Sequence, residues 1–312
     1  MIWLVYSILA ACSFGMRGIL YHWTSQQPLS RNALLCGTFF SGAVISLICA
    51  IATGQQWTLS ALIGIQMGLF SFGANASMFK GFAVGKASLV AILTALPSVV
   101  VVIVAFAMWG ETLNMMQFAA FAVIIAGVLL VRYSNDLSMK NLQGAQWGLL
   151  AMLLFAANDL SGKWSTMMEA PMFPTLVYMF ASGTVCFGLW WLKDKKAEQT
   201  QAALAGKRLN ASEGSGEKAV IASVNESPAR WSSKRTFMTG MAVGITNAVG
   251  MMLIITAFDH GKAGLVSAVT ALNVLIVLLY TRFVVKERFT RLETIGISTA
   301  FAGILFMRLY GG

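Results

Sequence analysis

Residues 85–96 read GKASLVAILTAL, and residues 261–272 read GKAGLVSAVTAL. These stretches open a match without gaps between residues 85–132 and residues 261–308, at an offset of 176 positions. Both copies begin with Gly-Lys-Ala, place a Glu at the same position (Glu111 and Glu287) and close on an Arg. An apolar composition alone explains shared Leu and Val residues, but it does not explain these three features. The chain is therefore an internal duplication.

The composition is that of a chain embedded in a bilayer. Of 312 residues, 57% are hydrophobic and 11% are charged, against about 25% charged in a typical soluble domain. A membrane span needs about 20 apolar residues and must be helical, because lipid cannot satisfy an exposed backbone. Apolar windows of that length predict ten transmembrane helices, at residues 2–20, 32–53, 58–79, 84–108, 113–132, 145–167, 171–192, 236–258, 262–285 and 290–309.

The duplication divides these helices into two halves. The halves are residues 1–134 and residues 145–311, and the second contains a polar cytoplasmic segment at 193–235 that is expected to be a mobile linker. Because five is odd, the second half must enter the membrane from the opposite side. The predicted fold class is therefore an all-α integral membrane protein with two inverted five-helix repeats, an architecture of many secondary transporters. A second match, at an offset of 146, places Arg17 of the first span on Lys163 of the sixth.

The positive charges predict how the chain lies in the membrane. A net charge of +10 in a soluble protein would suggest nucleic acid as a partner, but here the charges lie between apolar spans. The odd-numbered loops hold 17 Lys and Arg residues, against two on the other side, Lys262 and Arg308. The positive-inside rule places the odd loops in the cytoplasm and both termini outside. Residues 1–11 contain no Lys or Arg, so the first span is expected to remain uncleaved.

The repeated pattern resembles the EamA-like transporter family of the drug/metabolite transporter superfamily. The features that carry the resemblance are the small-residue start of each copy, the Glu at the turn and a Gly in the final helix, namely Gly85, Lys86, Ala87, Pro97, Glu111 and Gly127, with Gly261, Lys262, Ala263, Glu287 and Gly303. The resemblance implies two inverted bundles around a central cavity, a bacterial inner membrane location and transport of small metabolites, often export of amino acids or related compounds. Asn273 replaces Pro97 in the second copy, which leaves a matching kink there open.

Charged residues inside predicted spans are the first candidates for substrate contact, because such charges are costly and usually face a wet pathway. They are Arg17 in the first span and Asp159 and Lys163 in the sixth, beside Asn158. Asp159 and Lys163 are four residues apart, so they either neutralise each other or contact a ligand. In the second case Asp159 binds a proton or an amine, while Arg17 and Lys163 bind a carboxylate or phosphate. Arg17 alternatively extends to the membrane surface.

Neutral and turn residues form a second group. Asn75 and Asn247 lie in apolar spans of matching order, where they either line the substrate path or join helices, and Gln66 is a weaker candidate of the same kind. Glu111 and Glu287 are interpreted as structural braces of short turns. The Asp259-His260 pair is interpreted as a solvated loop rather than a pH-sensitive gate.

The sequence argues against an enzyme. It has two histidines, four cysteines without metal-ligand spacing, and none of the phosphate-loop, zinc-protease or hydrolase motifs. We expect no cofactor and no metal. The predicted function is a secondary active transporter, an exporter of a small metabolite, with a small-molecule substrate, membrane lipid and either a coupled proton or a counter-substrate as partners. The alternative is a membrane sensor or lipid-handling scaffold on the same duplicated fold.

Overall fold

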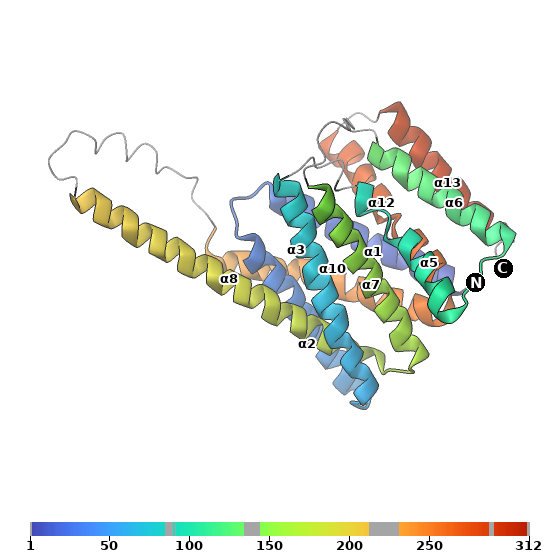
Figure 1. The fold of residues 1–312 in the computed structure, drawn as a ribbon, viewed down its shortest axis with the longest axis horizontal. Helices are drawn as coiled ribbons and strands as arrows, with labels where there is room; N and C mark the ends of the chain where they lie inside the picture. The colour runs from blue at the N-terminus through green and yellow to red at the C-terminus, as the bar shows by residue number, and fades with distance from the viewer. Residues whose placement is uncertain are drawn as a thin grey trace.

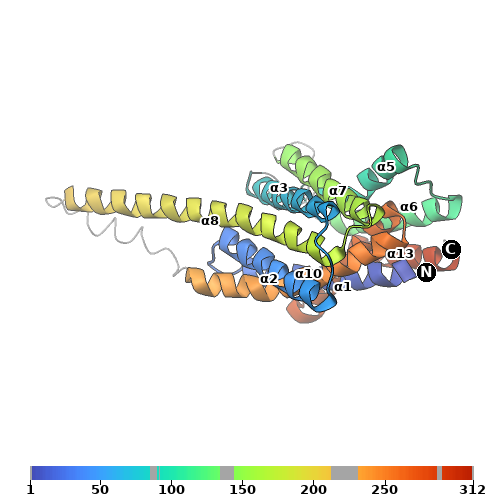
Figure 2. The ribbon, with the colours of Figure 1, turned by 90° about the horizontal axis from the view of Figure 1, so that it is seen from below.

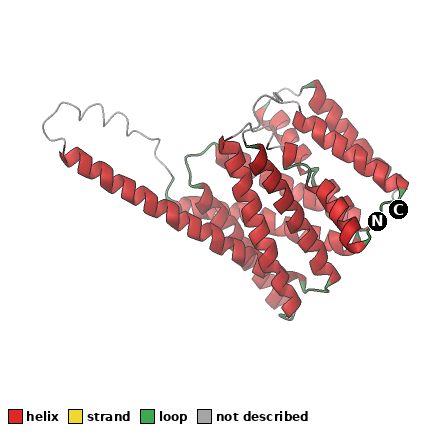
Figure 3. Ribbon diagram, viewed as in Figure 1, coloured by secondary structure: helices red, strands yellow, loops and turns green. Residues whose placement is uncertain are grey.

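The computed structural model describes residues 2–84, 90, 92–133, 144–211, 231–286 and 290–310. All regular elements in these residues are helices (Figure 3). In chain order they are α1 (Ile2–Ser25), α2 (Arg31–Thr53), the 3₁₀ turn η1 (Leu59–Leu62), α3 (Ile63–Val84), α5 (Pro97–Trp109), α6 (Met115–Tyr133), α7 (Ala145–Met167), α8 (Met172–Ala211), α10 (Ser233–His260), α11 (Ala263–Thr270), α12 (Asn273–Tyr280), the π-helical turn η2 (Thr281–Val285) and α13 (Arg291–Tyr310).

Seven helical segments in the described residues are long and apolar enough to cross a membrane, and two further apolar helices, Pro97–Trp109 and Met115–Val131, are shorter. The predicted count of ten spans therefore stays a prediction. α7 has sufficient length, with 23 residues, but Asn158, Asp159 and Lys163 make it less apolar than the seven. These three residues of α7 are also predicted site residues.

The helices of the two halves interleave. α2 packs between α8 and α10, α3 packs on both α7 and α8, and α1 packs on α10. α6 and α13 form a separate pair at the edge of the bundle (Figure 1). Figure 2 shows α3 and α7 in one layer and α1, α2 and α10 in the other. The start of α1 and the end of α13 lie at the same end of the molecule, whereas the far end of α8 projects beyond the opposite end (Figure 1).

Glycines allow α2 and α10 to approach closely. A Cβ atom on Gly37 of α2 would lie 2.2 Å from the carbonyl oxygen of Phe237, and one on Gly240 of α10 would lie 2.1 Å from the carbonyl oxygen of Leu34. Contacts between small residues replace the hydrophobic effect as the force that joins helices in lipid. Any larger side chain at these two positions would push the helices apart.

The ninth predicted span is interrupted. α11 ends at Thr270 and α12 begins at Asn273. The same break occurs in the first half, where residues 94–95 form a turn before α5 begins at Pro97. The amide of Leu96 donates to the carbonyl of Leu93, and at the matching position Leu272 donates to Val269, each at 3.1 Å. The kink left open by Asn273 is thus present without a proline.

α8 differs from its expected length. The predicted span ended at residue 192 and was followed by a linker at 193–235, but the helix continues to Ala211, and α10 begins at Ser233. The reason is local composition, because residues 193–211 are rich in Ala, Lys, Gln and Leu, which are strong helix formers. Residues 212–230 lie outside the described part of the chain.

Candidate functional site

Asp159 and Lys163 of α7 do not pair with each other. The Oδ2 atom of Asp159 accepts a hydrogen bond of 2.6 Å from the hydroxyl of Ser267 on α11. Lys163 instead forms an ion pair with Glu111, with 3.5 Å between Nζ and Oε1. The alternative in which these two residues neutralise each other is therefore wrong, because each finds a partner elsewhere in the chain.

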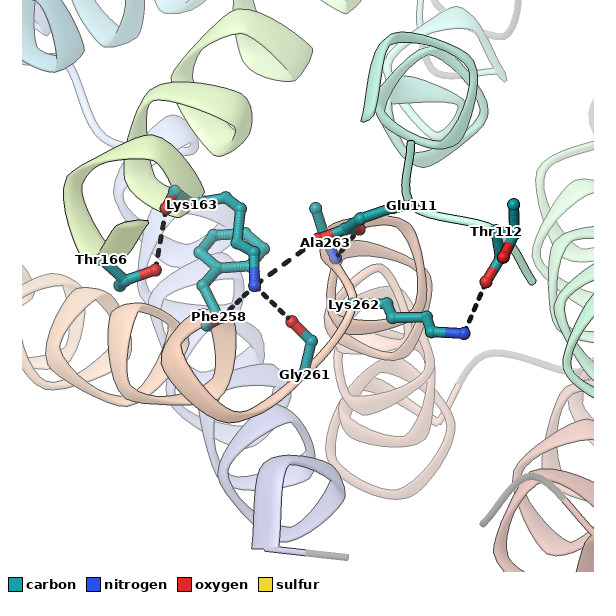
Figure 4. A network of polar contacts seen from close by, with 8 residues as sticks. All are labelled: Glu111, Thr112, Lys163, Thr166, Phe258, Gly261, Lys262 and Ala263. Atoms are coloured by element: carbon teal, nitrogen blue, oxygen red, sulfur yellow. Dashed lines mark hydrogen bonds and ion pairs between the residues drawn. The ribbon is translucent and has the colours of Figure 1, made fainter. Parts of the chain in front are cut away.

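Lys163 joins three segments at one end of the bundle (Figure 4). Its ammonium donates to the carbonyl oxygens of Phe258 and Gly261, at 2.8 Å each, where α10 ends. The second carboxylate oxygen of Glu111 accepts from the amide of Ala263, the first residue of α11, at 2.9 Å. A cation at the end of one helix and a carboxylate at the start of the next both complement the helix dipoles. We call Lys163, Glu111, Phe258, Gly261 and Ala263 the outer brace.

Glu111 was predicted to brace its own turn, but its carboxylate instead joins α7 to the start of α11, through Lys163 and Ala263. Gly110 precedes it with a φ of 66°, in the left-handed region, and ends α5. That turn directs the chain so that Glu111 faces α11. Lys262 supports the same loop by donating to the carbonyl of Thr112 (Figure 4) and to the side chain of Gln117. Glu287, the matching residue, lies outside the described part of the chain.

Arg17 and Asn247, both predicted site residues, contact each other. Nη1 of Arg17 on α1 donates to Oδ1 of Asn247 on α10, and Asn247 is 3% exposed. The guanidinium also lies 4.6 Å from the ring centroid of Phe14 and 5.9 Å from that of Tyr21. The side chain thus turns into the bundle, and the alternative in which it extends to the membrane surface is wrong. In the described residues no carboxylate lies within ion-pair distance of Arg17.

The remaining candidates divide into two groups. Asn158 is buried, and its Oδ1 atom has no hydrogen-bond partner in the described residues. Asn75 donates to the carbonyl of Ser71 in its own helix, at 2.7 Å. Gln66 donates to Ser161 at 2.9 Å and joins α3 to α7. Asn158 therefore has capacity for a ligand, while Asn75 and Gln66 are already engaged within the protein.

A cavity of about 310 Å³ opens at the other end of the bundle from the outer brace, and sequence analysis did not find it. It lies between the end of α1, the start of α2, α3 and the middle of α8. Its lining consists of Tyr21, Thr24, Ser25, Gln27, Leu29, Ser30, Arg31, Asn32, Leu34, Leu35, Phe79 and Asp194. Tyr21 lines this cavity, and the guanidinium carbon of Arg17 lies 5.9 Å from its ring centroid.

The geometry is that of a helical membrane protein with charged groups held between its helices. Comparison with protein families gives a match to the EamA-like transporter family over residues 1–133 and 219–309. The chain belongs to this family, so it is a multi-pass integral membrane protein and a transporter of the drug/metabolite type. Members of the family are transporters rather than enzymes.

Comparison with solved structures supports the fold. One crystal structure of another protein superposes with a TM-score of 0.72 at 12% sequence identity, and the match covers 98% of this chain and 97% of that chain. At this identity the likeness concerns the fold alone. No curated protein matches the chain at a significant level.

Proposed function

We propose that this protein is a secondary active exporter of a small metabolite, such as an amino acid or related compound, and that it works by alternating access between two inverted halves. The observation that carries the proposal is a pair of opposite charges inside membrane helices, Arg17 on α1 and Asp159 on α7. Each contacts a neutral partner, Asn247 or Ser267, and in the described residues neither forms an ion pair.

Placing such charges inside a membrane has a high free-energy cost. A charged side chain at the centre of a membrane helix costs roughly 2.5–3.5 kcal/mol on insertion scales and usually marks a substrate or ion path. A structural role would favour pairing the two charges, as Lys163 and Glu111 are paired in the outer brace. Arg17 suits a carboxylate or phosphate on the solute, because a guanidinium binds such groups through two parallel hydrogen bonds. Asp159 suits an amine or a coupled proton.

The two ends of the bundle differ in a way that suits alternating access. At the end that the charge distribution assigns to the outside, the outer brace joins α7, α10, α11 and the loop after α5. At the cytoplasmic end, the cavity beside Tyr21 is open. This arrangement corresponds to a transporter that faces the cytoplasm, which is the state in which an exporter takes up its solute.

The helix packing supports two related halves. α1, α2 and α3 of the first half correspond to α7, α8 and α10 of the second half. α1 and α2 both pack on α10, and their counterparts α7 and α8 both pack on α3. Each relation maps onto the other when the two halves exchange roles, as expected for an inverted repeat. The matching breaks before Pro97 and Asn273 follow the same relation.

The end of the bundle assigned to the cytoplasm carries pairs of basic and aromatic side chains. Arg31 lies 4.3 Å from the ring centroid of Phe79, Lys80 lies 4.0 Å from that of Trp147, and Arg235 lies 3.8 Å from that of Trp231. Basic and aromatic residues are both typical of the membrane interface, and the basic ones of its cytoplasmic side. We therefore propose a plasma membrane location, in bacteria the inner membrane, with both termini outside.

The test is efflux from liposomes that contain the purified protein, with a panel of amino acids, sugars, nucleotide sugars and cationic drugs, with and without a pH gradient. We expect flux of at least one compound, and a loss of about tenfold or more in Arg17→Gln and Asp159→Asn. Asn75→Ala is the matched control, because Asn75 bonds within its own helix, and it should retain flux. If no compound in the panel is transported, the proposed exporter is contradicted and the alternative of a sensor or scaffold on this fold is favoured.

A further inference from the structure

The cavity at the cytoplasmic end contains two opposite charges that do not meet. Arg31 at the start of α2 stacks on the ring of Phe79, with 4.3 Å from its guanidinium carbon to the ring centroid. Asp194 on α8 accepts a hydrogen bond of 2.7 Å from the side-chain amide of Asn32. Both residues line the cavity, yet within the described part of the chain neither forms an ion pair.

Each of these charges is held in place by a neighbour that leaves it uncompensated. The ring of Phe79 fixes Arg31 through a cation–π contact, which leaves the edge of the guanidinium free to donate. Asn32 occupies one lone pair of Asp194, whereas a carboxylate accepts up to about four hydrogen bonds. The residues next to Asp194 in the chain are lysines, but Lys195 stacks on the ring of Trp191, at 4.3 Å from its centroid, instead of pairing with Asp194.

We propose that this cavity is a loading site for a zwitterionic solute with an apolar body. The anionic group of the solute binds Arg31, its ammonium binds Asp194, and its apolar part lies against Phe79 and Tyr21. This inference rests on the proposed function, because it makes the cavity the first site that an exported solute occupies. It adds a site separate from Arg17 and Asp159 and assigns the solute a charge of each sign.

The size and position of the cavity agree with this role. Ligand pockets usually occupy about 300–1,000 Å³, and this cavity has about 310 Å³, so it suits a solute at the small end of that range. Tyr21 forms a wall of the cavity and lies one helical turn from Arg17, whose guanidinium carbon is 5.9 Å from its ring centroid. A solute that leaves the cavity past Tyr21 therefore reaches the Arg17 site next.

The experiment is equilibrium binding to the full chain in lipid nanodiscs. The probes are radiolabelled L-phenylalanine, L-leucine and L-methionine, with phenethylamine and 3-phenylpropionate as competitors that each lack one charge. We expect at least one amino acid to bind, and each single-charge analogue of phenylalanine to compete at least about tenfold more weakly than phenylalanine itself. Arg31→Gln and Asp194→Asn should each raise Kd about tenfold or more, since each removes a charge-assisted hydrogen bond.

Two matched variants control for charge and fold. Lys196→Gln removes a cation two residues from Asp194 on the exposed side of α8, and Asp259→Asn removes an acid at the opposite end of the bundle. Both should bind as the wild type does. Asp194→Glu keeps the charge and should retain binding within about threefold, provided that each variant elutes and melts as the wild type does.

The possible results separate the two proposals. Unchanged binding in Arg31→Gln and Asp194→Asn, or no binding of any amino acid, overturns the loading site. The proposed function is then still decided by the flux measured for the wild type and for the Arg17 and Asp159 variants. Charge-dependent binding without flux overturns the proposed function and supports the cavity as a zwitterion site.

Discussion

Removing Lys163 from the outer brace should strongly destabilise the protein. The side chains of Lys163 and Glu111 are 13% and 17% exposed, and their charged atoms are 3.5 Å apart. Lys163→Met leaves Glu111 without its cation and two carbonyl oxygens at the end of α10 without a donor. Breaking such a pair from one side costs about 3–5 kcal/mol. Glu111→Gln should cost less, about 1–3 kcal/mol, because the amide oxygen of Gln can still accept from Ala263.

A double-mutant cycle isolates the interaction itself. The free energy of unfolding is measured by SDS titration in mixed micelles for the wild type, both single variants and the double variant. We expect a coupling energy of about 1–3 kcal/mol, because the two side chains are in direct contact and partly desolvated. Lys163→Met combined with Glu293→Gln at the start of α13 is the control cycle. Additive effects within about 0.5 kcal/mol in the Lys163/Glu111 cycle would refute the brace.

Three further predictions concern packing, the Arg17 site and orientation. Gly37→Ala should lower the melting temperature, at a cost of about 1–3 kcal/mol, because the new Cβ would lie 2.2 Å from a carbonyl oxygen of α10. Gly188→Ala should not lower it, because the atom nearest to its new Cβ would be 3.6 Å away. Equal melting temperatures of the two variants would contradict the close approach of α2 and α10. Asn247→Leu should reduce flux at least about tenfold by removing the partner of Arg17, while Asn75→Leu should not, and equal effects would mean that Asn247 has no special role. A reporter enzyme fused to the C-terminus should be active on the outer side, and cytoplasmic activity would reverse the assigned orientation.

Hydropathy located the helices well but could not define their internal breaks or true ends. α7 begins and ends at the predicted residues 145 and 167, because the polarity of the chain changes sharply there. The break between Thr270 and Asn273 lies inside a continuous apolar stretch, so apolarity alone gives no sign of it. The continuation of α8 to Ala211 is equally invisible to hydropathy, because hydropathy does not distinguish a polar helix in water from a polar loop.

The site was partly predictable. Arg17 and Asn247 stood out separately as polar groups in apolar spans, but their contact joins positions 230 residues apart, and one sequence carries no signal for such a contact. The four-residue spacing of Asp159 and Lys163 left their pairing open, because it shows that two side chains can meet, not that they do. The hydrogen-bond partner of Asp159 is Ser267, 108 residues further along the chain. The cavity beside Arg31 was missed because it forms between residues of α1, α2, α3 and α8 that lie far apart in the sequence.

Counterflow is the most direct test of transport by alternating access. Liposomes containing the protein are loaded with unlabelled solute, diluted into a trace of the same labelled solute and followed over time. A carrier that exposes one site to each side in turn should accumulate label transiently above the outside concentration, and the Arg17→Gln protein should not. Label that merely equilibrates, at a rate independent of the internal load, would contradict alternating access. Label that enters no faster than it enters protein-free liposomes would contradict transport itself.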